Sequence, residues 1–309
     1  MDTMLHLRLI TPPNKTDEVV RLIEKTVGTT HLVVMAGAAR NPVGDVVLCD
    51  VAREAGDELI GVLRASGLDE TGSIAVENID LSLSKRAEKA EAEAPGEGAD
   101  AVLWEHLAEA THEESTLSIT YIAFITLATM IAACGVVLDN AILIVGAMAV
   151  GPEFGPLAGF STAIVQRHPR LALRSLTALL VGFAVAMAVT VGFSLLMDSL
   201  GYFTEAKLEA ERPNTAFVYA PDAFSFIVAV LAGIAGTLSL TSAKSGALVG
   251  VAISVTTVPA AANAAVALSY GDTKQTVGST EQLLLNLLGI ILAGTLTLLF
   301  QKWLWSKPR

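Results

Sequence analysis

The sequence contains little cysteine and few basic residues. Only two of its 309 residues are cysteine, Cys49 in a hydrophilic region and Cys134 within an apolar run, which excludes a disulfide framework and a zinc site of clustered ligands. Lysine and arginine together number 20 against 31 aspartates and glutamates, which gives a formal net charge of -11. Because phosphate binding needs a concentrated positive surface, we expect no nucleic-acid partner.

Motifs for catalysis are also missing. The five histidines lack the spacing of metal ligands, and the serine, histidine and aspartate residues form no hydrolase motif. We therefore expect no metal, no cofactor and no enzymatic activity. The opening sequence MDTMLHLRLITPP lacks the basic start and long apolar core of a secretory signal, so we expect the N-terminus to remain on the side of the membrane where it is made.

What the sequence does contain is apolar residues. Hydrophobic residues make up 52% of the chain and charged residues 17%, which is too apolar for a soluble domain. Six apolar segments follow residue 116, each near the roughly 20 residues that span a hydrocarbon core of about 30 Å. They are 117–138, 141–165, 171–197, 223–240, 245–268 and 282–303. We therefore predict an all-α transmembrane domain at 117–309, with the lipid bilayer as its partner.

The first 81 residues have the pattern of a small α+β domain. Leu5, Leu7 and Leu9 alternate with polar residues, which predicts a half-buried strand. Further strands are expected near 31–36, 45–51 and 74–79, with amphipathic helices around 19–27 and 59–63. The order βαββαβ is that of a ferredoxin-like domain.

Residues 82–116 connect the two predicted domains. The sequence KRAEKAEAEAPGEGAD predicts a charged, solvated linker. Helical spacing of apolar residues beyond residue 101 then predicts a short amphipathic helix on the membrane surface, with a plain connector helix as an equal alternative.

The basic residues of the loops predict the orientation in the membrane. They lie between spans two and three, between spans four and five, and after span six, whereas the opposite side is acidic. Cytoplasmic loops carry the excess of lysine and arginine. We therefore expect a multi-pass protein of the cell (inner) membrane whose N-terminal domain and C-terminus are both cytoplasmic.

The second span contains the sequence GAMAVGPEFGPLAG. Its prolines have no backbone N–H to donate to a helical hydrogen bond, and its glycines destabilise a helix. We therefore do not expect a continuous helix here. Non-helical backbone at this depth is tolerated only where it is buried in protein or lines a wet cavity. The break therefore indicates a binding site or pore.

The fifth span contains a counterpart, GVAISVTTVPAAAN. Its place within spans four to six matches that of span two within spans one to three, and two three-helix units insert with opposite topology. This predicts the 3+3 inverted repeat with broken helices that many secondary transporters share. The predicted substrate- or ion-binding residues of the two segments are Gly151, Pro152, Glu153, Gly155, Pro156, Ser254, Thr256, Thr257, Pro259 and Asn263.

Glu153 is the one carboxylate deep inside a predicted span. Burying its charge costs at least about 2.5 kcal/mol, which favours a role in proton or cation coupling. A neutral acid that fastens the broken helix to a backbone carbonyl is the open alternative. Asp139 and Asn140 stand at the predicted outer mouth, where a helix cap is the simpler role. For Asn263, a hydrogen bond between helices is the simpler role.

These motifs resemble a known family. The segment LDNAILIVGAMAVGPEFGPLAG resembles the Asp-x-x-hydrophobic-Gly-Ala-Met pattern, followed by small-Pro-x-x-Gly-Pro, of the bacterial and archaeal membrane proteins called domain of unknown function 389. The segment GALVGVAISVTTVPAAAN is similar to that family's second glycine-rich, proline-ended segment. The resemblance covers nearly the whole chain and implies a multi-spanning membrane protein, without implying an activity.

The chain departs from the family pattern at three places. Gly151 stands where members commonly have serine, and Glu153 where they commonly have an apolar residue. The second segment ends in Val258, Pro259 and Ala260 instead of Val-Pro-Pro. The resemblance therefore implies that a function of Glu153 would belong to a subgroup.

Two functions fit these observations. The first is a transporter or channel for a small solute or ion, with residues 151–156 facing 254–259 and the N-terminal domain sensing a small-molecule ligand. The second is a non-transporting oligomeric scaffold or sensor. Glycines within the spans favour close helix packing, so a homo-oligomer is expected.

Overall fold

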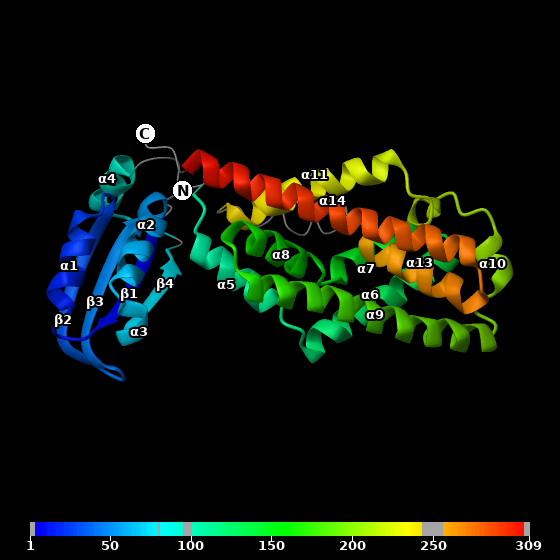
Figure 1. The fold of residues 1–309 in the computed structure, drawn as a ribbon, viewed down its shortest axis with the longest axis horizontal. Coiled ribbons are helices and arrows are strands. Elements are labelled where there is room, and N and C mark those ends of the chain that lie inside the picture. The colour runs from blue at the N-terminus through cyan, green and yellow to red at the C-terminus, as the bar shows by residue number, and fades with distance from the viewer. Residues whose placement is uncertain (1–3, 80, 95–100, 243–255, 306–309) are drawn as a thin grey trace. The chain divides into compact units, whose positions relative to one another are not determined.

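The computed structural model describes residues 4–79, 81–94, 101–242 and 256–305. Backbone contacts divide the chain near His106 into an N-terminal unit and a helical unit. Figure 1 shows the sheet of the first unit and the long helices of the second.

The N-terminal unit is a four-stranded antiparallel sheet with helices. Its elements are β1 (Met4–Thr11), α1 (Thr16–Lys25), β2 (Thr29–Arg40), β3 (Val43–Ala52), α2 (Arg53–Ala65), α3 (Leu68–Thr71), β4 (Ser73–Asn78) and α4 (Lys85–Glu93). The strands lie in the order β2-β3-β1-β4. The predicted alternation of β1 is confirmed, because Leu5, Leu7 and Leu9 are at most 1% exposed and pack in one core with α1 and α2.

Residues 85–93 were predicted to be part of a solvated linker, but in the structure they form helix α4, which packs on the sheet. Ser84 caps this helix by accepting hydrogen bonds from the backbone of Arg86 and Ala87. Ala87 and Ala90 are buried, and α4 contacts β2 and β3. The small alanine side chains let one face of a charged helix approach the sheet closely, whereas composition alone had indicated a segment that packs on nothing.

The helical unit consists mainly of α-helices in the part of the chain that the structure describes. They are α5 (Trp104–Glu114), α6 (Ile119–Val137), α7 (Ala141–Val150), α8 (Phe154–Gln166), α9 (Pro169–Ser199), α10 (Glu205–Glu209), α11 (Ala223–Thr241), α13 (Thr257–Tyr270) and α14 (Thr273–Trp305). Within the described residues, α6, α9, α11 and α14 are each long and apolar enough to cross a membrane. Helices α7 and α8 are bent by 52° at a short break, and if this pair is taken as one broken span, the number of spans is five. This set of helices is that of a membrane protein.

Two predicted spans differ from the observed helices. The first half of the segment 245–268 lies outside the described residues, and the second half is α13. Helix α14 begins at Thr273, well before the predicted start at residue 282. Its first turns are polar, and they are stabilised by burying Ser279 against other polar side chains.

The helices α8 and α13 end in the same way. In α8, Arg167 adopts the left-handed conformation and the N–H of His168 donates to the carbonyl of Ala163. In α13, Gly271 adopts this conformation and the N–H of Asp272 donates to the carbonyl of Ala267. These are the bonds of a Schellman motif, and each is followed at once by a long helix, α9 or α14. Both long helices contact both α8 and α13.

Candidate functional site

The site begins at the break between α7 and α8. Gly151 ends α7 in an extended conformation, and Glu153 is the N-cap of α8. Pro152 lies in the break, and Pro156 is the third residue of α8, where a missing N–H leaves no helical hydrogen bond unmade. Glu153 is only 4% exposed, so the break carries a buried carboxyl group.

Helix α13 begins at the same point. Thr256 is its N-cap, Thr257 its first residue and Pro259 its third. The Oγ1 of Thr257 donates a hydrogen bond of 2.7 Å to the Oε1 of Glu153. A side chain at Gly151 would collide with Glu153 and with Val258, whose Cγ2 would lie 2.9 Å from the added Cβ, so glycine is needed for this close approach.

The N-terminal ends of two half-helices therefore meet at Glu153. Figure 1 shows α13 in orange beside α7 in green, and α7 and α13 are in contact. Each helix N-terminus carries roughly half a positive elementary charge, which favours a carboxylate between them. The second oxygen, Oε2 of Glu153, is buried and has no hydrogen-bond partner in the described part of the chain.

Polar side chains of α14 continue the site. Thr256 accepts a hydrogen bond of 2.7 Å from the amide of Asn286 and one of 3.4 Å from the amide of Gln282. The Oε1 of Gln282 is buried, and it too lacks a partner among the described residues. Asn286 of α14 therefore bonds to α13, which is the kind of interhelical contact predicted for Asn263.

A second buried polar cluster surrounds Arg212, which lies between α9 and α11. Arg212 is 3% exposed. It donates to Asn263 of α13 over 3.0 Å and to Gln275 of α14, and its guanidinium lies 4.8 Å from the centre of the Tyr219 ring. Asn263 donates in turn to Ser279 over 2.7 Å. Burial lowers the pKa of Arg212, and its Nε has no partner among the residues described.

The two residues that were predicted at an outer mouth, Asp139 and Asn140, have structural contacts. Asn140 caps α7, with Oδ1 accepting from the backbone of Ile142 over 2.9 Å and of Leu143 over 3.2 Å. Asp139 accepts hydrogen bonds from Thr215 and from Asn214. Burial alone would raise the pKa of Asp139, but these hydrogen bonds outweigh it and the pKa is lowered. Asp139 thus holds the segment between α9 and α11 in place, whereas Asn140 fixes the start of α7.

The structure thus brings residues of both predicted segments together at Glu153, whereas Asn263 lies in the separate cluster of Arg212. Glu153 meets Thr257, Gly151 meets Val258, and Asn263 binds Arg212. Ser254 lies outside the described residues. Arg212, Gln275 and Gln282 were missed, because a single basic or amide residue in a loop or near a helix end carries no signal of burial in the sequence.

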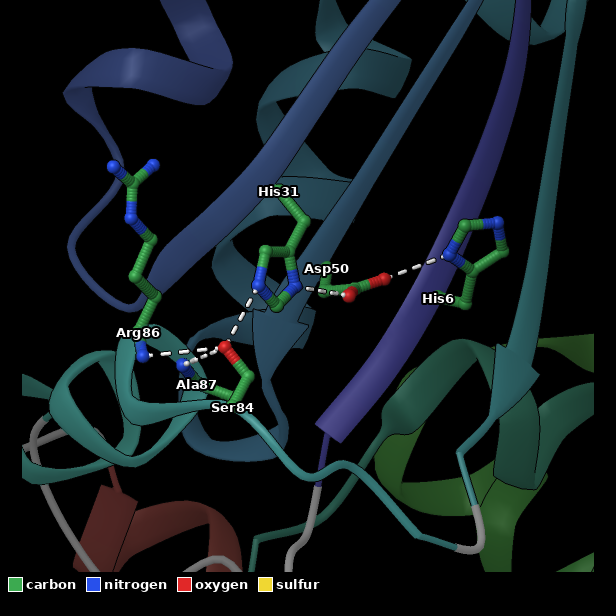
Figure 2. Close-up of polar contacts among 6 residues, drawn as sticks. All are labelled: His6, His31, Asp50, Ser84, Arg86 and Ala87. Atoms are coloured by element: carbon green, nitrogen blue, oxygen red, sulfur yellow. Dashed lines mark hydrogen bonds and ion pairs between the residues drawn. The ribbon is translucent and has the colours of Figure 1, made fainter.

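The N-terminal unit holds a separate polar cluster, shown in Figure 2. The two oxygens of Asp50 bond the Nδ1 atoms of His6 and His31, each over 2.7 Å, and the Nε2 of His31 lies 3.0 Å from the Oγ of Ser84. Hydroxyl, imidazole and carboxylate follow each other as in serine hydrolases. However, the Ser84 oxygen already accepts two backbone hydrogen bonds as the cap of α4, so the cluster fastens α4 to the sheet.

Part of the helical unit matches the model of a known family. Residues 148–292 match the model of the family described as Domain of unknown function (DUF389), which confirms the resemblance seen in the sequence. An uncharacterized protein of Methanocaldococcus jannaschii is 26% identical over 204 residues, which is 66% of this chain and 61% of that protein. The chain thus spans less than two thirds of this relative. No solved structure matches it. The matched residues include both half-helix N-termini and the Arg212 cluster.

Proposed function

We propose, from the premise that residues 148–292 carry the DUF389 domain, that this protein is a membrane transporter or channel for a small solute or ion. One observation carries the proposal: two half-helices begin at a buried carboxyl group that has an unpartnered oxygen. Broken helices with buried, unsatisfied polar groups are the usual architecture of transporter binding sites. The membrane is the cell (inner) membrane.

We further propose that the helical unit is a 3+3 inverted repeat. Helices α6 to α9 form the first repeat, and α11 to α14 form the second. Two similarities support it. Proline is the third residue of both α8 and α13, and both helices end in a Schellman motif before a long helix. In addition, each half-helix contacts the long helix of the other repeat as well as its own.

The N-terminal unit is proposed to be a ferredoxin-like regulatory domain on the cytoplasmic side. The element order and the strand order β2-β3-β1-β4 support this fold. The basic residues Arg167, Arg170 and Arg174 at the α8–α9 connection support a cytoplasmic position for that turn, and hence for both chain termini. The proposal assigns no catalytic residue and no cofactor.

Flux through reconstituted liposomes tests the transport function. The full chain is reconstituted, and efflux of inorganic ions and small metabolites is compared with that of protein-free vesicles. Glu153→Gln should change the flux, because it alters the charge between the half-helices. The control Glu113→Gln, at an exposed position of α5, should not. Absence of flux for every solute, with Glu153→Gln identical to the parent, would argue strongly against transport.

The alternative, a non-transporting oligomeric sensor, has one observation in its favour. A side chain added at Gly146 of α7 or Gly192 of α9 would meet nothing within 4 Å, and small residues on open helix faces allow another helix to pack closely. Deleting residues 1–81 separates the two functions. A transporter should keep part of its flux, whereas a sensor should lose its output.

A further inference from the structure

We infer that the site between α8 and α13 binds a small monovalent anion, and that the carboxylate of Glu153 occupies the place of this anion in the structure. The transport part of the inference rests on the function proposed above. The binding part does not depend on flux.

The charge around Glu153 supports an anion. The described residues form no ion pair with Glu153, and the contacts of its Oε1 come from Thr257 at the start of α13. The positive potential is therefore that of the N-terminal backbone N–H groups of α8 and α13. The helix dipoles attract a free small anion in the same way as they attract the carboxylate of a side chain.

The carboxylate is also incompletely held. Thr257 binds one of its oxygens, whereas the other is buried without a partner in the described structure. The side chain of Glu153 bends back to lie beside Gly151, in the space that a side chain there would fill. Because only one oxygen of the Glu153 carboxylate is hydrogen-bonded, a free small anion can displace this carboxylate from the N-termini of α8 and α13.

Two further charged residues agree with this assignment. Glu114 of α5 lies against Gly155, so a second acidic side chain packs beside the first turn of α8, as expected where a helix N-terminus attracts negative charge. Arg212 bonds Asn263, which lies six residues after Thr257, or about 9 Å along α13. No carboxylate forms an ion pair with Arg212 in the described part of the protein. A buried positive charge on the same helix favours anions over cations.

Thermal unfolding of the purified full chain tests binding. Glu153→Ala removes the carboxylate and leaves a space of its size, and formate is used as the probe because it is the free equivalent of that group. At ten times its dissociation constant, formate should raise the Tm of this variant by about 3–6 °C. The parent, and the control Glu113→Ala, should not respond. Gluconate at equal ionic strength serves as the bulky anion that does not fit.

Flux in liposomes tests transport. Glu153→Gln removes the competing charge with little change of shape, so efflux of chloride and formate should be about tenfold faster than in the parent. Efflux of sodium and potassium ions should not increase. If Glu153→Ala does not fold, stabilisation of Glu153→Gln by chloride replaces the formate measurement.

The outcomes separate the two claims. Formate stabilisation together with faster anion efflux supports both. Flux confined to cations, without formate stabilisation, overturns the anion site and leaves the transport function standing. Formate stabilisation without any flux supports the anion site and overturns transport, whereas the absence of both overturns both.

Discussion

At the scale of single residues, Glu153 shows how a buried acid can be placed where the chain is broken. The sequence left two roles open, and one was a neutral acid bonded to a backbone carbonyl. In the structure the hydrogen bond to Glu153 comes from a hydroxyl, that of Thr257. A hydroxyl donating to a carboxylate oxygen favours the charged form, and so do the two helix N-termini, whereas the burial of Glu153 opposes it.

Removing the hydroxyl of Thr257 should therefore weaken the fold. Thr257→Val leaves Oε1 of Glu153 buried without its donor, which should lower the free energy of unfolding by about 1–3 kcal/mol. Thermal unfolding in detergent measures this as a lower Tm. The control Thr177→Val removes an exposed hydroxyl of α9. Equal Tm values for the two variants would show that the bond to Glu153 contributes nothing.

Cys49 provides a residue-scale prediction for the N-terminal unit. The side chain is fully buried in β3, and burial, followed by the charge of Asp50, raises the pKa of its thiol to about 12. An unfolded thiol has a pKa near 8.5. The folded state thus keeps its proton when the unfolded state loses it, and this contribution to stability is lost as the pH rises from about 8.5 towards 12.

Thiol labelling checks this prediction. In the variant Cys134→Ala, which keeps Cys49 as its single cysteine, a maleimide at pH 8.5 should not react with the native protein. It should react promptly after denaturation, because about half of the exposed thiols are then ionised. Rapid labelling of the native protein would show that β3 opens readily.

At the scale of elements, the sequence indicated those features that local chemistry determines. Alternating leucines predicted β1, and glycine with proline predicted that the second span is broken where α7 meets α8. The features that were missed depend on contacts distant in sequence. The burial of Arg212 requires Asn263 and Gln275 from two later helices, and no local pattern shows that a loop folds back in this way.

Helix α4 should depend on its cap. Ser84→Ala removes the hydroxyl that caps α4 and contacts His31, which should cost about 0.5–2 kcal/mol. Hydrogen exchange of residues 85–93 should accordingly be faster. His6→Ala is the matched control, because His6 bonds the other oxygen of Asp50 and does not contact Ser84. Equal protection of α4 in the two variants would contradict the assigned role of the cluster.

The segment between α9 and α11 should be released by changing Arg212. Arg212→Gln loses charged hydrogen bonds to Asn263 and Gln275 and the contact with Tyr219. We expect a loss of about 1.5–3 kcal/mol for each bond and faster proteolysis within residues 200–222. Lys207→Gln changes an exposed cation in the same segment and should have little effect. Unchanged proteolysis of Arg212→Gln would show that Arg212 does not hold the segment.

At the scale of the whole molecule, the equivalence of α8 and α13 has a consequence for topology. Each is followed by a left-handed residue, one further residue and a long helix. Since their N-terminal ends meet at Glu153, the C-terminal ends should reach opposite faces of the membrane. The starts of α9 and α14 should then be on opposite sides, with α9 starting in the cytoplasm because its first turns are basic.

Single cysteines at matched positions test this topology. Arg170 and Lys274 are the second residues of α9 and α14, and both are exposed. In a background with Cys49→Ala and Cys134→Ala, a membrane-impermeant maleimide added to intact cells should label Lys274→Cys and leave Arg170→Cys unlabelled until the membrane is permeabilised. Labelling of both from the same side would remove the basis of the inverted repeat, because two half-helices that enter from one side cannot present their N-termini to each other across Glu153.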